Sequence, residues 1–104
     1  MPMRIISIKT LREFWQRHAD ARTPLLDWFR TTEAAQWRNF TDARRTFGSA
    51  DTAKVDSGNT VTIFDIGGNK YRLIASIHYN TGVVYALMVL THAQYDSQKW
   101  KAQL

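Results

Sequence analysis

Three strand-like runs in the second half of the chain restrict its fold more than any other feature. They cover Val61–Ile66, Tyr71–Tyr79 and Val83–Leu90, and are rich in β-branched and aromatic residues. The short segments between them, Gly67–Asn69 and Asn80–Gly82, contain residue types that tolerate positive φ angles. Strands joined by such short turns pair antiparallel with their neighbours in sequence. The sequence therefore predicts a meander sheet, with the most apolar run, Val83–Leu90, at its centre.

The first half of the chain predicts one strand and then helices. An apolar run over Met3–Ser7 suits a strand, and Thr10 with Glu13 has the spacing of a capping box that opens a helix. Thr23-Pro24 marks the start of a second helix, which is expected to reach Trp37. The apolar positions at helical spacing are Leu11, Phe14, Trp15, His18 and Ala19 in the first helix, and Leu25, Trp28, Phe29 and Thr32 in the second.

Three further segments complete the expected order of elements. Thr41–Phe47 fits a short helix, and Ser49–Asn59 is polar and is expected to be a loop. Thr91 with Gln94 forms another capping box, which predicts a terminal helix that continues through Trp100. The order β-α-α-β-β-β-α predicts an α+β fold, in which an antiparallel sheet carries its helices on one face.

Length, charge and the absence of cysteine exclude several classes of protein. The 104 residues fit a single domain over 1–104, and the net charge of +5 favours a polyanionic partner. The lack of cysteine excludes disulfides, thiolate metal sites and a cysteine nucleophile, and fits the reducing cytoplasm. We expect no signal peptide and no membrane segment, because the longest apolar run, Val83–Leu90, is far short of ~20 residues. Eight arginines precede Thr46, so a solvated basic outer face is expected on the helices.

Alternation along the middle strand separates an apolar face from a polar one. Tyr71, Leu73, Ala75, Ile77 and Tyr79 form the face that can receive the helices, and Arg72, Ile74, Ser76 and His78 form the other. A guanidinium in mid-strand is costly unless it faces solvent, a carboxylate or a ligand phosphate. Arg72 is therefore either a structural partner of Asp65 or a phosphate-binding group.

The expected terminal helix supplies a second set of polar residues. His92, Tyr95, Asp96 and Lys99 recur at i, i+3, i+4 and i+7, which places them on one helix face. These side chains could transfer protons and hold a phosphate, or Tyr95 could pack on the sheet while His92 and Lys99 lie in water.

The strand that ends at Leu90 brings these residues near Lys70 and Arg72. Such a group could perform RNA strand scission, in which a ribose 2′-OH loses a proton, a phosphorane is stabilised and a 5′-oxygen is protonated. No metal is needed, because the 2′-OH is an internal nucleophile, and the three histidines lack ligand spacing. His18 is expected to be a half-buried structural residue. Whether the set shares one face depends on the hairpin register, which the sequence leaves open.

Two segments of the second half are similar to a known family. The run from Ile63 to Ala75, IFDIGGNKYRLIA, followed by Val89–Asp96, VLTHAQYD, resembles the HigB family of toxins within the RelE-like group. The resemblance is strongest from Phe47 to Trp100. It implies a RelE-like microbial-ribonuclease α+β fold and no cofactor or metal. It also implies cleavage of mRNA on the translating ribosome, which leaves a 2′,3′-cyclic phosphate and a 5′-hydroxyl.

The resemblance also assigns residues and partners. Arg72, His92 and Tyr95 match the family motif and are expected to be catalytic, and Asn69, Lys70 and Lys99 are expected as supporting groups that bind RNA or phosphate. The implied partner is a helix-turn-helix antitoxin, through which alone the protein would contact operator DNA. Leu87 stands where many relatives carry a basic residue, so one phosphate contact is expected to be missing. Two alternatives stay open, a gyrase-poisoning toxin of the same fold and a basic RNA- or antitoxin-binding protein without catalysis.

Overall fold

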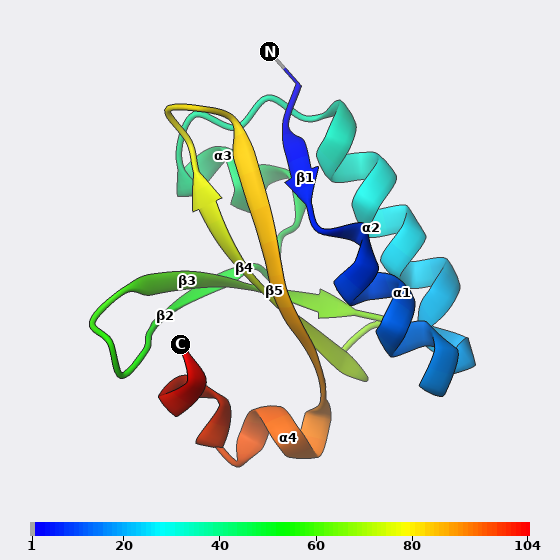
Figure 1. The fold of residues 1–104 in the computed structure, drawn as a ribbon. Coiled ribbons are helices and arrows are strands. Elements are labelled where there is room, and N and C mark those ends of the chain that lie inside the picture. The colour runs from blue at the N-terminus through cyan, green and yellow to red at the C-terminus, as the bar shows by residue number, and fades with distance from the viewer. Residues whose placement is uncertain (1) are drawn as a thin grey trace.

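Five strands form the centre of the protein, whose structure, a computed structural model, describes residues 2–104 (Figure 1). The strands lie in the order β1-β5-β4-β3-β2. Their bounds are β1 Arg4–Ile6, β2 Asp51–Lys54, β3 Thr60–Ile66, β4 Tyr71–His78 and β5 Val83–Thr91. The predicted α+β class and the three-strand meander are confirmed, although β4 and not β5 is the middle strand. The prediction of a purely antiparallel sheet is wrong, because β1 pairs with β5 in parallel.

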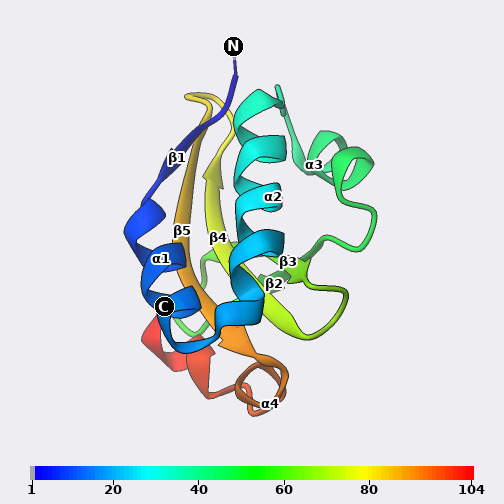
Figure 2. The same ribbon diagram turned by 90° about the vertical axis from the view of Figure 1, so that its right-hand side faces the viewer.

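The two long helices lie near the start of the chain, and the other helical segments are short (Figure 2). Their bounds are α1 Ile8–Arg17, η1 Ala19–Ala21, α2 Arg22–Ala34, α3 Phe40–Thr46, α4 His92–Asp96 and η2 Lys99–Gln103, where η denotes a 3₁₀-helix. Among residues 2–104 no helix is long and apolar enough to cross a membrane.

The main core lies between the sheet and the two long helices. Leu11 and Phe14 of α1 and Leu25 and Trp28 of α2 are buried, as their helical spacing predicts. They meet the apolar face of β4, where Leu73 and its alternate neighbours pack in the same cluster. The alternation of apolar and polar residues along β4 thus correctly predicts which face of the sheet α1 and α2 cover.

A second core lies on the opposite face of the sheet. Val61 and Ile63 of β3 and Ile74 of β4 pack there against Trp100 of η2. The C-terminal segment thus covers the face that α1 and α2 leave open, and the prediction that all helices share one face is wrong. Trp100 explains the difference, because its large ring needs an apolar surface that the first face no longer offers.

Several predicted element ends differ from the structure. The helix α1 begins after Ser7 without a side-chain cap, so Thr10 and Glu13 do not form a capping box. The helix α2 begins at Arg22, after the 3₁₀ turn, and ends at Ala34 instead of Trp37. The expected loop contains the strand β2, a polar edge strand whose exposed side chains hide its alternation.

The terminal helix is also shorter than predicted. It ends at Asp96, and Gln98 adopts a left-handed φ of 63° before η2 begins. Lys99 therefore does not continue the helix face of His92 and Tyr95. The capping box that opens α4 is confirmed, since Thr91 accepts from Gln94 N at 3.2 Å and the Gln94 side chain accepts from Thr91 N at 3.0 Å.

Candidate active site

The register of β4 and β5 determines which residues meet at the end of the sheet. Tyr71 pairs with Thr91 and Arg72 pairs with Leu90, so the start of α4 lies beside the start of β4. The register shifts once, because Ile74 pairs with Met88 whereas Ala75 pairs with Ala86. Leu87 is the extra residue of this β-bulge. This register shows which residues of β4 and β5 lie side by side, which the turn lengths alone left open.

Arg72 is held by contacts on its own sheet face. Its Nε lies 3.1 Å from Asp65 Oδ1, and its Nη1 donates to the backbone carbonyl of Asn69 at 2.7 Å. The side chain is only 13% exposed. Of the two alternatives left open for Arg72, the structure shows the pairing with Asp65, and Asn69 reaches this group through its backbone. The Arg72 guanidinium also lies over the ring of Tyr95, 5.2 Å from its centroid.

Tyr95 is fixed by the segment that follows it. Its ring stacks on Trp100, with centroids 5.7 Å apart, and Trp100 Nε1 donates to the Tyr95 carbonyl at 3.1 Å. Burial raises the pKa of the Tyr95 phenol, a change that the nearby Arg72 charge opposes without cancelling. Tyr95 therefore keeps its proton at neutral pH and can donate it.

His92 opens α4 and pairs with a carboxylate one turn later. Its Nδ1 lies 2.9 Å from Asp96 Oδ2, and both side chains are at least half exposed. A carboxylate only accepts hydrogen bonds, so this contact places the proton of a neutral His92 on Nδ1. The other ring nitrogen, Nε2, is then an acceptor that can take a proton from a ligand.

The two predicted lysines take different places. Lys70 forms an ion pair with Asp20 of η1, and that carboxylate also accepts from the Tyr71 hydroxyl. The hydrogen bond from Lys70, with a second from Tyr71, holds the pKa of Asp20 below its usual value. Lys99 is exposed on η2, beyond the break at Gln98. The structure thus brings Arg72 and Tyr95 into contact and ties Lys70 to the helical layer.

The remaining histidine of the helices has the structural place expected for it. His18 is half-buried and stacks on Phe14, with ring centroids 4.4 Å apart. No three His, Asp or Glu side chains gather as a metal site within residues 2–104. The eight arginines that precede Thr46 are all exposed, which confirms the predicted outer face.

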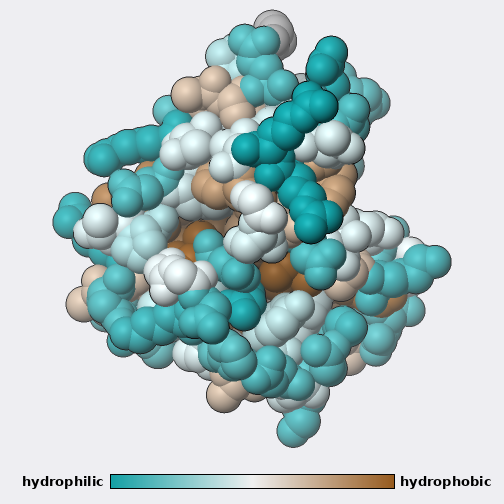
Figure 3. Space-filling view, turned by 180° about the vertical axis from the view of Figure 1, so that it is seen from behind, coloured by the Kyte–Doolittle hydropathy of each residue, from teal (hydrophilic) through white to brown (hydrophobic). Residues whose placement is uncertain are grey.

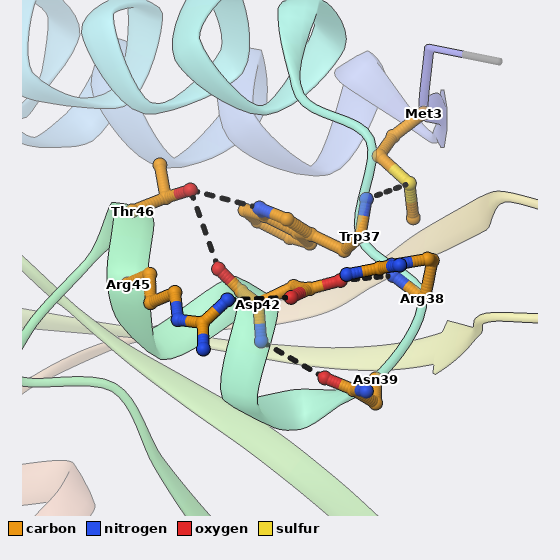
Figure 4. Close-up of polar contacts among 7 residues, drawn as sticks. All are labelled: Met3, Trp37, Arg38, Asn39, Asp42, Arg45 and Thr46. Atoms are coloured by element: carbon orange, nitrogen blue, oxygen red, sulfur yellow. Dashed lines mark hydrogen bonds and ion pairs between the residues drawn. The ribbon is translucent and has the colours of Figure 1, made fainter.

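A second polar cluster surrounds α3 (Figure 4). Arg38 and Arg45 approach Asp42 from opposite sides, with N···O distances of 3.1 and 3.6 Å. Trp37 Nε1 donates to Thr46 Oγ1 at 2.9 Å beside them. A cleft of about 720 Å³ lies next to this cluster, between the α2–α3 connection and the β4–β5 turn. The back of the molecule, where α3 lies, is mostly hydrophilic, and apolar residues show mainly in its hollows (Figure 3).

The Asp42 contacts predict an acid-sensitive contribution to stability. Hydrogen bonds from the Arg38 side chain and backbone hold the pKa of Asp42 below its unfolded value. The stabilisation is complete above the unfolded pKa and is lost as the pH falls through the folded pKa. We expect Asp42→Asn to lower the urea midpoint at pH 7 and to flatten its decline in acid. Asp27→Asn, on exposed α2 surface, is the matched control and should change neither.

Two residues of the site, Asp96 and Trp100, are not predicted as functional groups from the sequence. Asp96 was placed on the correct helix face, but its role in orienting His92 was not inferred, although the i, i+4 spacing is a usable signal. Trp100 was expected only as the end of a helix. Nothing in the local sequence indicates the left-handed turn at Gln98 that returns Trp100 onto Tyr95.

Comparison with known proteins identifies the family of this chain. Residues 21–98 match the family described as HigB_toxin, the RelE-like toxic component of a toxin–antitoxin system. The relatives include the mRNA interferase toxin HigB of Escherichia coli K12 and the mRNA interferases HigB of Escherichia coli O157:H7 and Shigella flexneri. Each is 26% identical over 94 residues, which cover 90% of this chain and 88% of the relative. Because the match spans most of the chain, including Arg72, His92 and Tyr95, this protein belongs to the HigB family of RelE-like toxins.

Proposed function

We propose that this protein is an endoribonuclease toxin that cleaves mRNA on the translating ribosome without a metal. The observation that carries the proposal is the meeting of Arg72 and Tyr95 beside the start of α4, where Asp96 holds Nδ1 of His92. These groups match the needs of strand scission, namely a base, an acid and a cation for the phosphorane. The curated relatives are named for mRNA cleavage, which supports the same reaction here.

Each of the three side chains has one role in the proposed reaction. His92 Nε2 accepts the proton of the ribose 2′-OH, and the 2′-oxygen then forms a bond to phosphorus. Tyr95 donates its proton to the 5′-oxygen as the bond from that oxygen to phosphorus breaks. The products are a 2′,3′-cyclic phosphate and a 5′-hydroxyl, so no water or cofactor enters this step.

Arg72 stabilises the charge that develops on the phosphorane. Its Nε and Nη1 are used by Asp65 and by Asn69, and within residues 2–104 this leaves Nη2 to donate to a phosphate oxygen. Fixed donors of this kind need no rearrangement during the reaction. In this proposal Lys99 and the backbone around Asn69 add weaker contacts to the RNA, and Lys70 would have to leave Asp20 to do so.

The partners follow from the family and from the charge distribution. A toxin of a toxin–antitoxin system has an antitoxin partner. We infer that this antitoxin is a helix-turn-helix protein, that operator DNA is reached only through it, and that the toxin acts in the cytoplasm. The arginines on the exposed helix faces offer a broad positive surface for ribosomal RNA or an acidic antitoxin segment.

The test is cleavage of a defined mRNA by the purified protein with translating ribosomes. We expect product ends that are a cyclic phosphate and a 5′-hydroxyl, which form when the ribose 2′-OH and not a metal-bound water attacks phosphorus. Arg72→Lys retains a charge but loses the planar donor set, so its cleavage rate should fall strongly. Uncut mRNA with wild-type protein under these conditions would refute the proposal.

A gyrase-poisoning toxin is the second candidate, because Leu87 packs on the face of the sheet that holds Arg72, at a position where the family resemblance implies a basic residue. That replacement removes a phosphate contact and weakens the case for RNA chemistry. Induction of the protein in cells separates the two activities. We expect protein synthesis to stop before DNA replication, and the reverse order would favour action on gyrase.

A further inference from the structure

The face of the sheet opposite α1 and α2 holds a second aromatic group, at the hairpin end of β4 and β5 and outside the cluster around Trp100. Tyr85 and His78 contact each other there, with ring centroids 5.1 Å apart and planes inclined by 70°. Tyr85 is 37% exposed, and among residues 2–104 no other large apolar side chain counts as exposed. His78 is exposed beside it. Part of the Tyr85 surface is therefore accessible to a ligand.

This pair points to the same face of the sheet as the candidate active site. The bulge lies on β5, so alternation on β4 is uninterrupted and His78 shares the face of Arg72. On β5, Val84 and Ala86 pack in the main core under α1 and α2. Tyr85, between them, therefore points to the opposite face.

The two groups lie at opposite ends of the same strands. Tyr85 pairs with Ser76, which is four positions along β4 from Arg72, or roughly 13 Å at the rise of an extended strand. Figure 1 shows the hairpin at one end of β5 and α4 at the other. An RNA strand held by its scissile phosphate at Arg72 must therefore extend beyond the two nucleotides that flank this phosphate to reach Tyr85.

The surface between the two ends favours contacts with bases over contacts with phosphates. Ser76, Leu87 and Met88 are half-buried on this stretch, and none of them carries a charge. Phosphate binding requires cations or backbone donors, and paired strands use their backbone donors within the sheet. Aromatic rings, in contrast, can stack on any base.

We propose that Tyr85, supported edge-on by His78, is a base-stacking subsite for a nucleotide of single-stranded mRNA outside the two that flank the cleaved bond. The proposal rests on the ribonuclease function proposed above and adds a determinant of RNA affinity outside the reacting groups. Tyr85 supplies a flat, rigid surface with few torsions to fix, and the His78 contact restricts its ring. The subsite tolerates different bases, because every base has a π face.

Binding of labelled oligonucleotides tests the subsite without cleavage. The His92→Ala protein is used as the background, with fluorescein-labelled decauridylate and with a diuridylate, whose two nucleotides only flank the bound phosphate. We expect Tyr85→Leu, which keeps apolar bulk but removes the ring, to weaken decauridylate binding roughly 5- to 150-fold. Tyr85→Phe keeps the ring and should bind like the parent. The diuridylate should bind equally to all three proteins.

Three results would overturn the subsite. The first is unchanged decauridylate binding in Tyr85→Leu, and the second is an equal loss for both oligonucleotides, which would indicate altered folding. The third is unchanged RNA binding with weakened co-purification of a co-expressed antitoxin, which would make the surface a protein interface. Cleavage by the protein with His92 intact is measured separately, so that a failed nuclease and a failed subsite give different patterns.

Discussion

Replacing His92 with alanine is expected to slow mRNA cleavage by about 10²- to 10⁴-fold, the usual contribution of a positioned general base. The side chain is half exposed and its one described partner is Asp96, so the fold loses little when the ring is removed. Single-turnover cleavage with saturating ribosomes measures the rate. Urea unfolding of the same preparation shows whether the stability is unchanged.

A variant of Asp96 tests whether His92 is catalytic or only lies near the site. Asp96→Asn removes the charge that favours the proton on Nδ1, and its amide can also present a donor to the ring. We expect cleavage to slow by less than in His92→Ala, with a change in the pH profile of the rate. Asp27→Asn is the matched control on α2 and should cleave like wild type. Full activity in His92→Ala would refute the assignment of His92 as the base.

Replacing Trp100 with alanine is expected to cost about 3–5 kcal/mol of unfolding free energy and to reduce cleavage. Trp100 is 3% exposed and fills the second core against Ile74 and the strand β3. It also stacks on Tyr95 and donates to the Tyr95 carbonyl. A loss of this size is a large part of the 5–15 kcal/mol typical of a small domain.

A milder variant keeps this prediction testable if the alanine protein does not fold. Trp100→Phe retains an aromatic ring over Tyr95 but loses the indole N–H and some volume, so it should unfold at lower urea than wild type and higher than Trp100→Ala. Its cleavage rate, measured well below the unfolding midpoint, should fall while RNA binding is retained. Wild-type stability in Trp100→Ala would show that η2 contributes nothing to the folded sheet.

The predictions that are confirmed depend on local sequence patterns whose structures tertiary packing also stabilises. The meander followed from glycine- and asparagine-containing turns between alternating runs, and the helix faces followed from residues such as Leu25 and Trp28. The capping box of Thr91 and Gln94 also formed as predicted, whereas the same spacing at Thr10 did not cap α1. Such a pair caps only where the chain enters the helix at that residue.

The features that were missed depend on distant contacts. The parallel pairing of β1 with β5 joins segments from opposite ends of the chain, and the strand β2 is recognised only through its pairing with β3. In the candidate site, the Asp65 partner of Arg72 was expected from their positions on adjacent strands. The ion pair of Lys70 with Asp20 was not, because η1 approaches β4 only in the folded protein.

The bulge at Leu87 divides β5 into two halves that can vary separately. Val84 and Ala86 point into the main core before it and Val89 points there after it, so the side-chain phase changes at the bulge. Leu87 and Met88 therefore point consecutively to the same face. Loss of this one residue would restore regular pairing while leaving every other side chain on its present face. The hairpin can thus gain or lose length during evolution without displacing α4, and alignments of relatives should permit a one-residue gap at this position.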